Sequence, residues 1–452
     1  MINDTIVAPA TPFGTGGISV IRISGPESLS FILKYINLPD GSPLELKHRM
    51  ATLVNLSDTD SNIFDQAVIT YYQNPHSYTG EELVEISCHG SPVIVQKILN
   101  IASSAGLRLA DPGEFTRRAF LNGKIDLLQA EAVANTINSL SIEGSKLNFQ
   151  ILSGVLSEKL FAIKSSLISA LSKVEFELDI SEESLQPELK SQLEDLLFPV
   201  QEMTSNLLSS YHYGNLLTKG ALVVIAGPPN VGKSTLLNSL SNSDRAITHD
   251  IPGTTRDPID VSFFIDGIPI TLVDTAGLRS TVEEIELKGI ARTKSYLEKA
   301  DLVIVLDSVE QPENYPDYSN LKCPLIFVTN KSDLLNKNQQ TGNIKNQIDK
   351  IYISALNSTG LHTLQDRIKE ALLVNEVLSS SVALTTGRQN SAIQTCHSRI
   401  EAASKLLHEI TPQYELIAFE LQESLNSLDA LIGKTTPDDI LNNVFNKFCV
   451  GK

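Results

Sequence analysis

The sequence predicts a multidomain protein of mixed α/β and α class, in which a parallel α/β domain is inserted into a helical domain. Three observations predict this class. Short apolar runs separated by turn signals fill the first part of the chain, strand and helix patterns alternate over residues 216–375, and helical periodicity flanks that region on both sides. A chain of 452 residues exceeds one hydrophobic core and agrees with about three domains.

Composition limits the classes of function. The formal net charge of −17 argues against a protein that coats nucleic acid non-specifically, so any RNA contact needs a local basic patch or a partner. No apolar run approaches the ~20 residues of a membrane span, and Met1–Thr5 lacks a secretory signal pattern. The four scattered cysteines predict free thiols in a reducing cytoplasm.

Residues 1–118 are predicted to form an N-terminal α+β domain. The apolar pattern predicts strands at Ile18–Gly25, Ala67–Tyr72 and Leu83–Ser87, and a helix over Pro92–Ile101. Cys88 and His89 are adjacent on a strand and so point to opposite faces, which favours a structural role over a nucleophile pair.

Residues 119–215 and 376–452 are predicted to be the two halves of a helical domain. Apolar residues recur at helical spacing from Leu127 to Ile137, and long amphipathic stretches follow. Pro187 and Pro199 are expected to mark helix boundaries. The acidic run 175–183 is interpreted as a solvated helix end and loop, and Thr436–Asp439 as a helix start.

Residues 216–375 alternate strands and helices, as a parallel sheet with crossover helices requires. Asp266-Gly267 separates two apolar runs and predicts a two-residue hairpin turn. Strands are expected at Leu222–Ala226, Ile270–Val273, Leu302–Leu306, Leu325–Val328 and Ile351–Ile353.

A glycine-rich loop, Gly227–Ser234, lies between the first of these strands and a helix-forming stretch that begins at Thr235. Strand, glycine loop and helix in this order are typical of a P-loop, because the glycines let backbone N–H groups surround a polyphosphate at the helix start. Lys233 would reach the terminal phosphates, and the Ser234 hydroxyl would bind Mg²⁺.

Further polar motifs follow the later strands. Asp274–Gly277 can hold Mg²⁺ through water and bond a γ-phosphate. In Asn330–Asp333, the Asp333 carboxylate accepts from the two N–H donors that guanine presents and adenine lacks. Lys331 would lie along the base, Asn330 would tie its loop to the P-loop, and Ser354–Leu356 would complete the base pocket. The set resembles the P-loop GTPases of the translation-factor-related branch.

Leu278 stands where small signalling GTPases place a water-orienting glutamine, and an apolar side chain cannot align water. The sequence singles out no arginine finger. The loop Thr248–Asp257 is rich in hydroxyls and backbone oxygens and could hold a cation beside the phosphates, with Asn230 as a ligand. Arg256 and Arg279 are interpreted as exposed or interface residues.

These features together resemble the bacterial tRNA-modification GTPase family MnmE (also TrmE), over nearly the whole chain from Asn3–Ala8 to Phe448–Lys452. In that family a K⁺ ion substitutes for the arginine finger, and two G domains hydrolyse GTP when they meet. The resemblance implies a homodimer built on the N-terminal domain. It also implies that Glu286 is the catalytic, water-positioning glutamate, whereas Glu283 and Glu284 are explained by a solvated helix face.

The resemblance implies the remaining nucleotide and metal contacts. Asn230, His249, Ile251 and Thr254 would bind K⁺, with His249 contributing a backbone carbonyl where some relatives have threonine. Thr255 would join Ser234 on Mg²⁺. The full set of implied GTP contacts is Asn230, Val231, Gly232, Lys233, Ser234, Thr235, His249, Asp250, Ile251, Pro252, Gly253, Thr254, Thr255, Asp274, Thr275, Ala276, Gly277, Asn330, Lys331, Asp333, Ser354 and Ala355.

The resemblance further implies that the N-terminal domain, which residue types alone suggest is a dimerisation module, binds a tetrahydrofolate derivative (5-formyl or 5,10-methylene). The implied folate contacts are Arg22, Glu85, Lys124 and Lys452. Cys449 lies in a C-terminal tail that is expected to be mobile and to bring its exposed thiol to the folate. A covalent role of this thiol stays open.

The implied activity is a K⁺-stimulated GTPase that helps to add an aminomethyl or carboxymethylaminomethyl group at C5 of the wobble uridine of certain tRNAs. An FAD-containing partner, MnmG, would complete a heterotetramer and supply redox chemistry and basic RNA-binding surface. The identity of the tRNAs and the choice between ammonium and glycine stay open. The alternative is a non-catalytic GTP-dependent assembly switch in ribosome or RNA maturation, which leaves the folate set and the cysteine tail unexplained.

Overall fold

The computed structural model describes residues 4–180, 187–241, 260–274, 294–312, 318, 320–335, 350–373, 382–433, 438–446 and 448–452. The chain divides into two compact units. One comprises residues 1–134, 151–200 and 395–452, and the other comprises residues 135–150 and 201–394. No helix in the described part of the chain is both long and apolar enough to cross a membrane.

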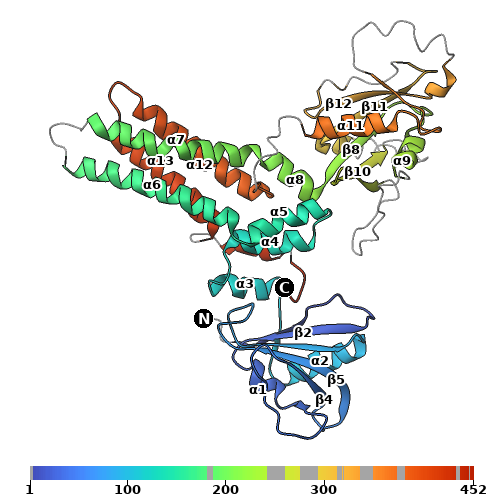
Figure 1. Ribbon diagram of the computed structural model, residues 1–452, viewed down its shortest axis with the longest axis vertical. Helices are drawn as coiled ribbons and strands as arrows, with labels where there is room; N and C mark the ends of the chain where they lie inside the picture. Colours follow the sequence, from blue (N-terminus) through green and yellow to red (C-terminus); the bar gives the residue numbers. More distant parts are fainter. Residues whose placement is uncertain are drawn as a thin grey trace. The chain divides into compact units, whose positions relative to one another are not determined.

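The N-terminal domain contains a mixed seven-stranded sheet with the order β3-β4-β5-β6-β2-β1-β7. Figure 1 labels β2, β4 and β5 of this sheet, together with the helices α1 and α2. All neighbouring strands are antiparallel except β1 and β7. The predicted strands and helix are present. The elements are β1 (Ile6–Pro9), β2 (Ile18–Ser24), α1 (Ser28–Ile32), β3 (Ile36–Asn37), β4 (Ala51–Ser57), β5 (Ile63–Tyr72), β6 (Leu83–His89), α2 (Pro92–Ser104) and β7 (Arg108–Leu109).

The two faces of this sheet differ. Ile21, Ile69 and Ile86 are fully buried in a core that also contains residues of α1 and α2. Because successive strand residues alternate, Arg22 and its cross-strand partner Glu85 lie on the other face. The same alternation buries Cys88 and exposes His89, as predicted. The sheet therefore carries its core on one face and polar chemistry on the other.

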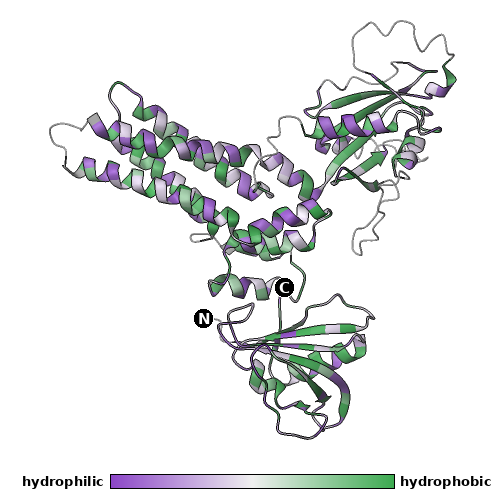
Figure 2. Ribbon diagram, viewed as in Figure 1, coloured by the Kyte–Doolittle hydropathy of each residue, from purple (hydrophilic) through white to green (hydrophobic). Residues whose placement is uncertain are grey.

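The helical part draws on segments far apart in the sequence. Helices α6 and α13 pack together (Figure 1), through buried residues such as Leu167 and Leu428 and an ion pair between Lys164 and Asp429. Figure 2 shows that these helices carry both apolar and polar residues along their length. The helices are α3 (Glu114–Leu121), α4 (Leu127–Ile137), α5 (Ile142–Leu152), α6 (Val155–Ile180), α7 (Pro187–Ser209), α8 (Tyr211–Lys219), α12 (Gly387–Leu407), α13 (Tyr414–Ile432) and α14 (Asp438–Phe445).

One predicted helix boundary was wrong, and the other lies at the edge of the described residues. The structure describes α7 from Pro187 onward, and Pro199 lies inside this helix of 23 residues. An internal proline removes a hydrogen bond and costs about 3 kcal/mol. The flanking Leu197 and Val200 are almost fully buried, and their packing keeps the helix continuous. The predicted helix start at Thr436 falls outside the described residues, which resume at Asp438 in α14.

The second sheet has six strands in the order β13-β12-β11-β8-β10-β9, and only β9 is antiparallel to its neighbour. Every strand predicted here is present. The hairpin turn is also present, with Asp266 (φ 47°) and Gly267 (φ 86°) both in the left-handed region. The elements are β8 (Ala221–Ala226), α9 (Lys233–Ser241), β9 (Asp260–Ile265), β10 (Ile268–Asp274), β11 (Leu302–Ser308), β12 (Leu325–Asn330), the 3₁₀ turn η1 (Ser332–Leu334), β13 (Ile351–Tyr352) and α11 (Leu361–Leu372).

Candidate functional site

The loop between β8 and α9 is shaped by close backbone contacts. A Cβ on Gly227 would lie 2.1 Å from the Leu306 carbonyl oxygen, and one on Gly232 would lie 2.3 Å from the Asn330 amide nitrogen. Gly232 and Asn230 also have positive φ values, 96° and 66°. Only glycine fits at Gly227 and Gly232, so the loop keeps the tight turn that a phosphate cradle needs.

The charged groups of this loop are held at the carboxyl ends of β8 and β10. The Lys233 side chain is buried, and its Nζ donates to the carbonyls of Gly227 (2.9 Å) and Pro228 (2.6 Å). The Ser234 hydroxyl donates to Asp274 Oδ2 at 2.7 Å. The hydroxyl and the carboxylate predicted to serve Mg²⁺ therefore meet directly. Thr235 is exposed in the first turn of α9.

The base-recognition motif is also assembled. Asn330 Nδ2 donates to the Val231 carbonyl at 2.9 Å, which confirms the predicted tie to the P-loop, and Asn330 Oδ1 accepts from the Ala355 N–H at 3.0 Å. The exposed Asp333 carboxylate accepts from the Ser354 hydroxyl at 2.6 Å through one oxygen. Its other oxygen and its exposure suit it to accept guanine N–H donors.

Two features of the base side were not anticipated. Lys331 has a left-handed backbone (φ 64°), and its ammonium pairs with Glu310 at 2.5 Å. Ser239, from α9, donates to the Ala355 carbonyl at 2.6 Å and so fastens the base loop to the P-loop helix. A lone serine in a helix gives no local signal of such a bond.

Many predicted contacts fall outside the described residues, and the structure places none of them. They are His249, Asp250, Ile251, Pro252, Gly253, Thr254, Thr255, Arg256, Thr275, Ala276, Gly277, Leu278, Arg279, Glu283, Glu284 and Glu286.

A second polar site lies on the open face of the N-terminal sheet. Arg22 donates to Glu85 Oε1 through Nε (3.0 Å) and Nη2 (2.7 Å), and through Nη1 to the Gly451 carbonyl (3.3 Å). Its guanidinium also lies 5.2 Å from the Tyr78 ring centroid. Glu85 Oε2 accepts from the Tyr72 hydroxyl at 3.4 Å. Sequence reasoning missed both tyrosines, since neither belongs to a recognised motif.

The C-terminal tail packs on this domain instead of extending freely, contrary to the expectation of a mobile tail. Phe448 is buried, and a Cβ on Gly451 would lie 2.1 Å from the Pro9 carbonyl oxygen. Burial lowers the pKa of Lys452, and the Arg22 charge adds to this while Glu85 opposes it, so the lysine lies near that pair. Cys449 is exposed, as predicted.

The four predicted folate contacts are thus brought to one region. Arg22, Glu85 and Lys452 form a single group, and Lys124 donates to the Pro75 carbonyl at 3.0 Å, in the turn that follows Tyr72.

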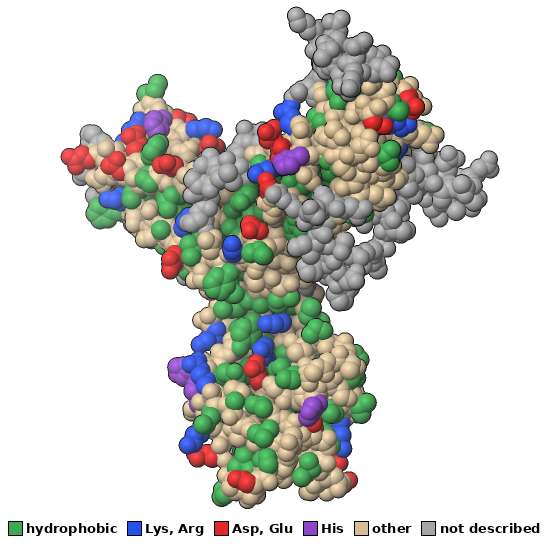
Figure 3. Space-filling model, turned by 45° about the vertical axis from the view of Figure 1, so that its right-hand side comes forward, with side chains coloured by type: hydrophobic (Ala, Val, Ile, Leu, Met, Phe, Trp, Pro, Cys, Tyr) green, Lys and Arg blue, Asp and Glu red, His purple; other side chains and the backbone are tan. Residues whose placement is uncertain are grey.

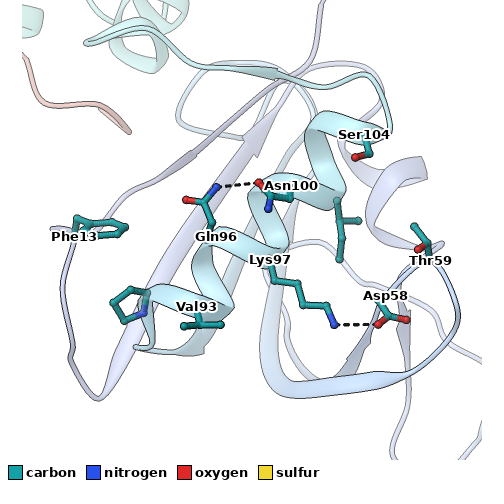
Figure 4. A pocket seen from close by; sticks show the side chains of 10 residues that line it. Phe13, Asp58, Thr59, Val93, Gln96, Lys97, Asn100 and Ser104 are labelled. Atoms are coloured by element: carbon teal, nitrogen blue, oxygen red, sulfur yellow. Dashed lines mark hydrogen bonds and ion pairs between the residues drawn. The ribbon is translucent and has the colours of Figure 1, made fainter.

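A groove of about 660 Å³ along α2 is separate from both sites (Figure 4). Its charged pair, Lys97 and Asp58, is already joined at 2.9 Å. The groove contains none of the predicted site residues. It is lined by Phe13, Asp58, Thr59, Pro92, Val93, Gln96, Lys97, Asn100, Ile101 and Ser104.

The P-loop between β8 and α9, the acid at the end of β10 and the Asn330–Asp333 motif define the class of P-loop GTP-binding proteins. Two family models match the chain: "GTP-binding protein TrmE N-terminus" over residues 5–124 and "MnmE helical domain" over residues 127–449. The chain belongs to the tRNA modification GTPase MnmE family and is a GTP hydrolase of that family.

Full-length relatives support the same family assignment. The tRNA modification GTPases MnmE of Koribacter versatilis and Moorella thermoacetica are each 37% identical to this chain, and each alignment covers 100% of both proteins. Among solved structures, Era of Aquifex aeolicus bound to GDP.AlF4⁻ is 26% identical over 42% of this chain and 69% of Era, with a TM-score of 0.27. The assignment to the family does not rest on that structural likeness.

Proposed function

We propose that this protein is a K⁺-stimulated GTPase that, with an FAD-containing MnmG partner, adds an aminomethyl or carboxymethylaminomethyl group at C5 of the wobble uridine of certain tRNAs. A tetrahydrofolate derivative would supply the one-carbon unit. One observation supports this most: Arg22 contacts both Glu85 and Gly451, which is 429 residues away in the sequence. A nucleotide-dependent switch would not need this group.

The residues of the N-terminal site fit a folate. Glu85 Oε1 is occupied by Arg22, whereas among the described residues Oε2 receives only a long hydrogen bond from Tyr72, so Oε2 can accept from the N–H donors of a pterin. The ammonium group of Lys124, which lies at the turn that follows Tyr72, suits the glutamate carboxylates at the other end, whereas Lys452 lies next to Arg22 and Glu85. We assign folate binding to residues 1–118 together with the C-terminal tail. We assign residues 119–215 and 376–452 to the two halves of the helical domain.

In residues 216–375, the bond between Ser234 and Asp274 supports a Mg²⁺ site to which Thr255 would contribute. Asn230, in the P-loop, is the described member of the proposed K⁺ set, which His249, Ile251 and Thr254 would complete. Glu286 would position the attacking water. K⁺, when bound, would neutralise charge that develops on the phosphates as two G domains of a homodimer meet.

The activity is tested on tRNA from cells that lack the protein. We expect wobble uridines without the C5 group, restored by the wild-type chain and not by Arg22→Ala, which should lose folate affinity while keeping GTP hydrolysis. Unchanged wobble uridines would favour the alternative, a GTP-dependent assembly switch.

The ion mechanism has its own test. Replacing K⁺ by Na⁺ should slow hydrolysis much more than it weakens GTP binding. Glu286→Ala should bind GTP but barely turn over, with Glu283→Ala as the matched control. Equal turnover in both salts, or a Glu286→Ala variant as active as its control, would contradict the proposed mechanism.

A further inference from the structure

A rim of basic side chains borders the Arg22–Glu85 site. We define it as His48, Arg49, His76 and Lys124, all of which are exposed. None of the four forms an ion pair with a carboxylate among the described residues, although acids outnumber bases by 17 in the chain. Figure 3 shows Lys, Arg and His side chains gathered along one edge of this domain. Two cations without a carboxylate partner, Arg49 and Lys124, beside two imidazoles on an acidic protein indicate an anionic ligand.

The rim residues come from different elements but converge on one turn. Arg49 Nη2 donates to the His76 carbonyl at 3.4 Å, and Lys124 Nζ donates to the carbonyl of the preceding residue, Pro75, at 3.0 Å. His48 Nδ1 accepts from the Gln73 N–H at 2.9 Å, and the rings of His48 and His76 lie 6.0 Å apart. All four side chains therefore lie around residues 73–76.

The rim is held in place and still has donors to offer. A guanidinium has five N–H donors and an ammonium has three, whereas Arg49 and Lys124 each use one in the contacts above. Because His48 Nδ1 is an acceptor, Nε2 carries the proton of the neutral ring. The Lys124 stem packs against Gly80, where a Cβ would lie 3.2 Å from its Cγ.

The turn connects the rim to the Arg22–Glu85 site. It follows directly after Tyr72, whose hydroxyl lies 3.4 Å from Glu85 Oε2. Burial is the largest cause that raises the pKa of Tyr72, and the charges of both Arg22 and Arg49 oppose it. The Tyr72 phenol therefore interacts electrostatically with Arg22 of the site and with Arg49 of the rim.

We propose that the rim binds the oligo-γ-glutamate tail of a folate whose one-carbon-bearing ring system lies at the Arg22–Glu85 site. The inference rests on the proposed folate function. A folate ends in a glutamate, and each glutamate added through the γ-carboxyl brings one more carboxylate on a flexible chain. Four donors around one turn match several carboxylates spaced a few atoms apart. Nucleic acid, by contrast, requires a stripe of cations that follows phosphates along the strand.

The test compares 5-formyltetrahydrofolate as the monoglutamate and as the pentaglutamate, titrated calorimetrically into the full-length protein. Wild type should bind the pentaglutamate about tenfold more tightly, since an exposed ion pair with Arg49 and hydrogen bonds from the two imidazoles add up to such a factor. High salt should remove the difference. Arg49→Gln and His76→Gln should lose the advantage while monoglutamate affinity stays unchanged. Lys34→Gln, another exposed lysine of this domain, is the matched control and should behave as wild type.

Several outcomes would overturn the inference. If the monoglutamate binds but the pentaglutamate binds no more tightly, the rim does not hold the tail, while the folate function stands. If neither binds, both proposals fail. If Arg49→Gln weakens both ligands equally, Arg49 belongs to the ring-system site. If Arg49→Gln instead weakens tRNA binding, measured by fluorescence anisotropy, and keeps the pentaglutamate advantage, the rim serves RNA phosphates.

Discussion

Asn330 uses both ends of its amide to hold two loops at the nucleotide site. Nδ2 reaches the carbonyl of Val231 in the P-loop, and Oδ1 receives the N–H of Ala355. The base side and the phosphate side are therefore positioned by one side chain. Asp333, three residues on, keeps one carboxylate oxygen on Ser354 and presents an exposed face.

Asp333→Asn should weaken GTP binding by about 3 kcal/mol, because the guanine donors lose a charged acceptor and meet a donor instead. Xanthine carries a carbonyl where guanine has its amino group, so the variant should prefer the xanthosine nucleotide. Fluorescent-nucleotide titrations measure both. Ser354→Ala keeps the carboxylate and should lose much less. Unchanged GTP affinity in the asparagine variant would contradict the assignment.

Among the residues that the structure describes, Arg118 is the largest fully buried side chain, and it is 1% exposed. Its guanidinium contacts Asp4 (2.8 Å), Glu114 (3.0 Å) and Glu81 (3.2 Å). Arg118→Met should cost about 3–5 kcal/mol, because it leaves carboxylates without their buried partner. Arg117 lies on the same helix and has no ion pair with any residue that the structure describes, so Arg117→Met should cost less than about 1 kcal/mol. Urea denaturation measures both, and equal losses would show that the cluster contributes little.

The same cluster predicts a pH dependence. Burial raises the pKa of Asp4 and Glu114, but hydrogen bonds and charges from Arg108 and Arg118 outweigh it, so both lie below their usual values. Their stabilisation is therefore fully present above the unfolded pKa of about 4 and is lost as pH falls through the lower folded values. The urea midpoint should fall below about pH 4, more steeply than in Arg118→Met. A constant midpoint would contradict this.

At the scale of elements, the position of the C-terminal tail depends on the close backbone contact of Gly451 with Pro9. Gly451→Ala should displace the tail, because φ is +95° and the new Cβ would lie 2.1 Å from the Pro9 carbonyl. Lys452 would leave the Arg22–Glu85 pair, so folate affinity should fall about tenfold. GTP hydrolysis by the G domain should persist.

Gly106→Ala is the matched control for the tail. Its φ of +94° is nearly the same, but nothing lies within 4 Å of the added Cβ. It should share the backbone strain and keep folate affinity. Faster carboxypeptidase digestion of Gly451→Ala alone would report release of the tail, and equal digestion of the two variants would argue against it.

At the scale of the whole molecule, the nucleotide domain and the N-terminal domain have separate cores. The core of the second sheet runs from Leu216 to Leu372, and that of the first sheet from Val7 to Leu107, with no shared residue. Separate cores predict separate responses to ligands and mutations.

Calorimetric unfolding tests this separation. GDP with Mg²⁺ at about 100 times Kd should stabilise the nucleotide domain against unfolding by about 2.7 kcal/mol and leave the unfolding transition of the N-terminal domain unchanged. Ile69→Ala removes a side chain from the buried core of the N-terminal sheet. It should lower the free energy of unfolding of the N-terminal domain by about 2–5 kcal/mol and leave GDP affinity unchanged. One transition that shifts as a unit in both experiments would show that the domains are coupled.

The sequence by itself determined the P-loop, the acid at the end of β10, the base motif and every predicted strand that the structure describes. These features are local, because a strand, its loop and the polar residues that follow it are consecutive in the chain. Resemblance also pointed to Arg22, Glu85 and Lys452, but nothing local indicated that they meet.

Only the tertiary structure decided which distant residues share a site. Arg22 meets Gly451 because the tail packs on the N-terminal domain, and Arg118 is buried because three carboxylates from different segments surround it. Pro199 stays inside a helix because packing outweighs its local preference. Such contacts depend on the pairing of strands and the filling of cores, which no short stretch of sequence specifies.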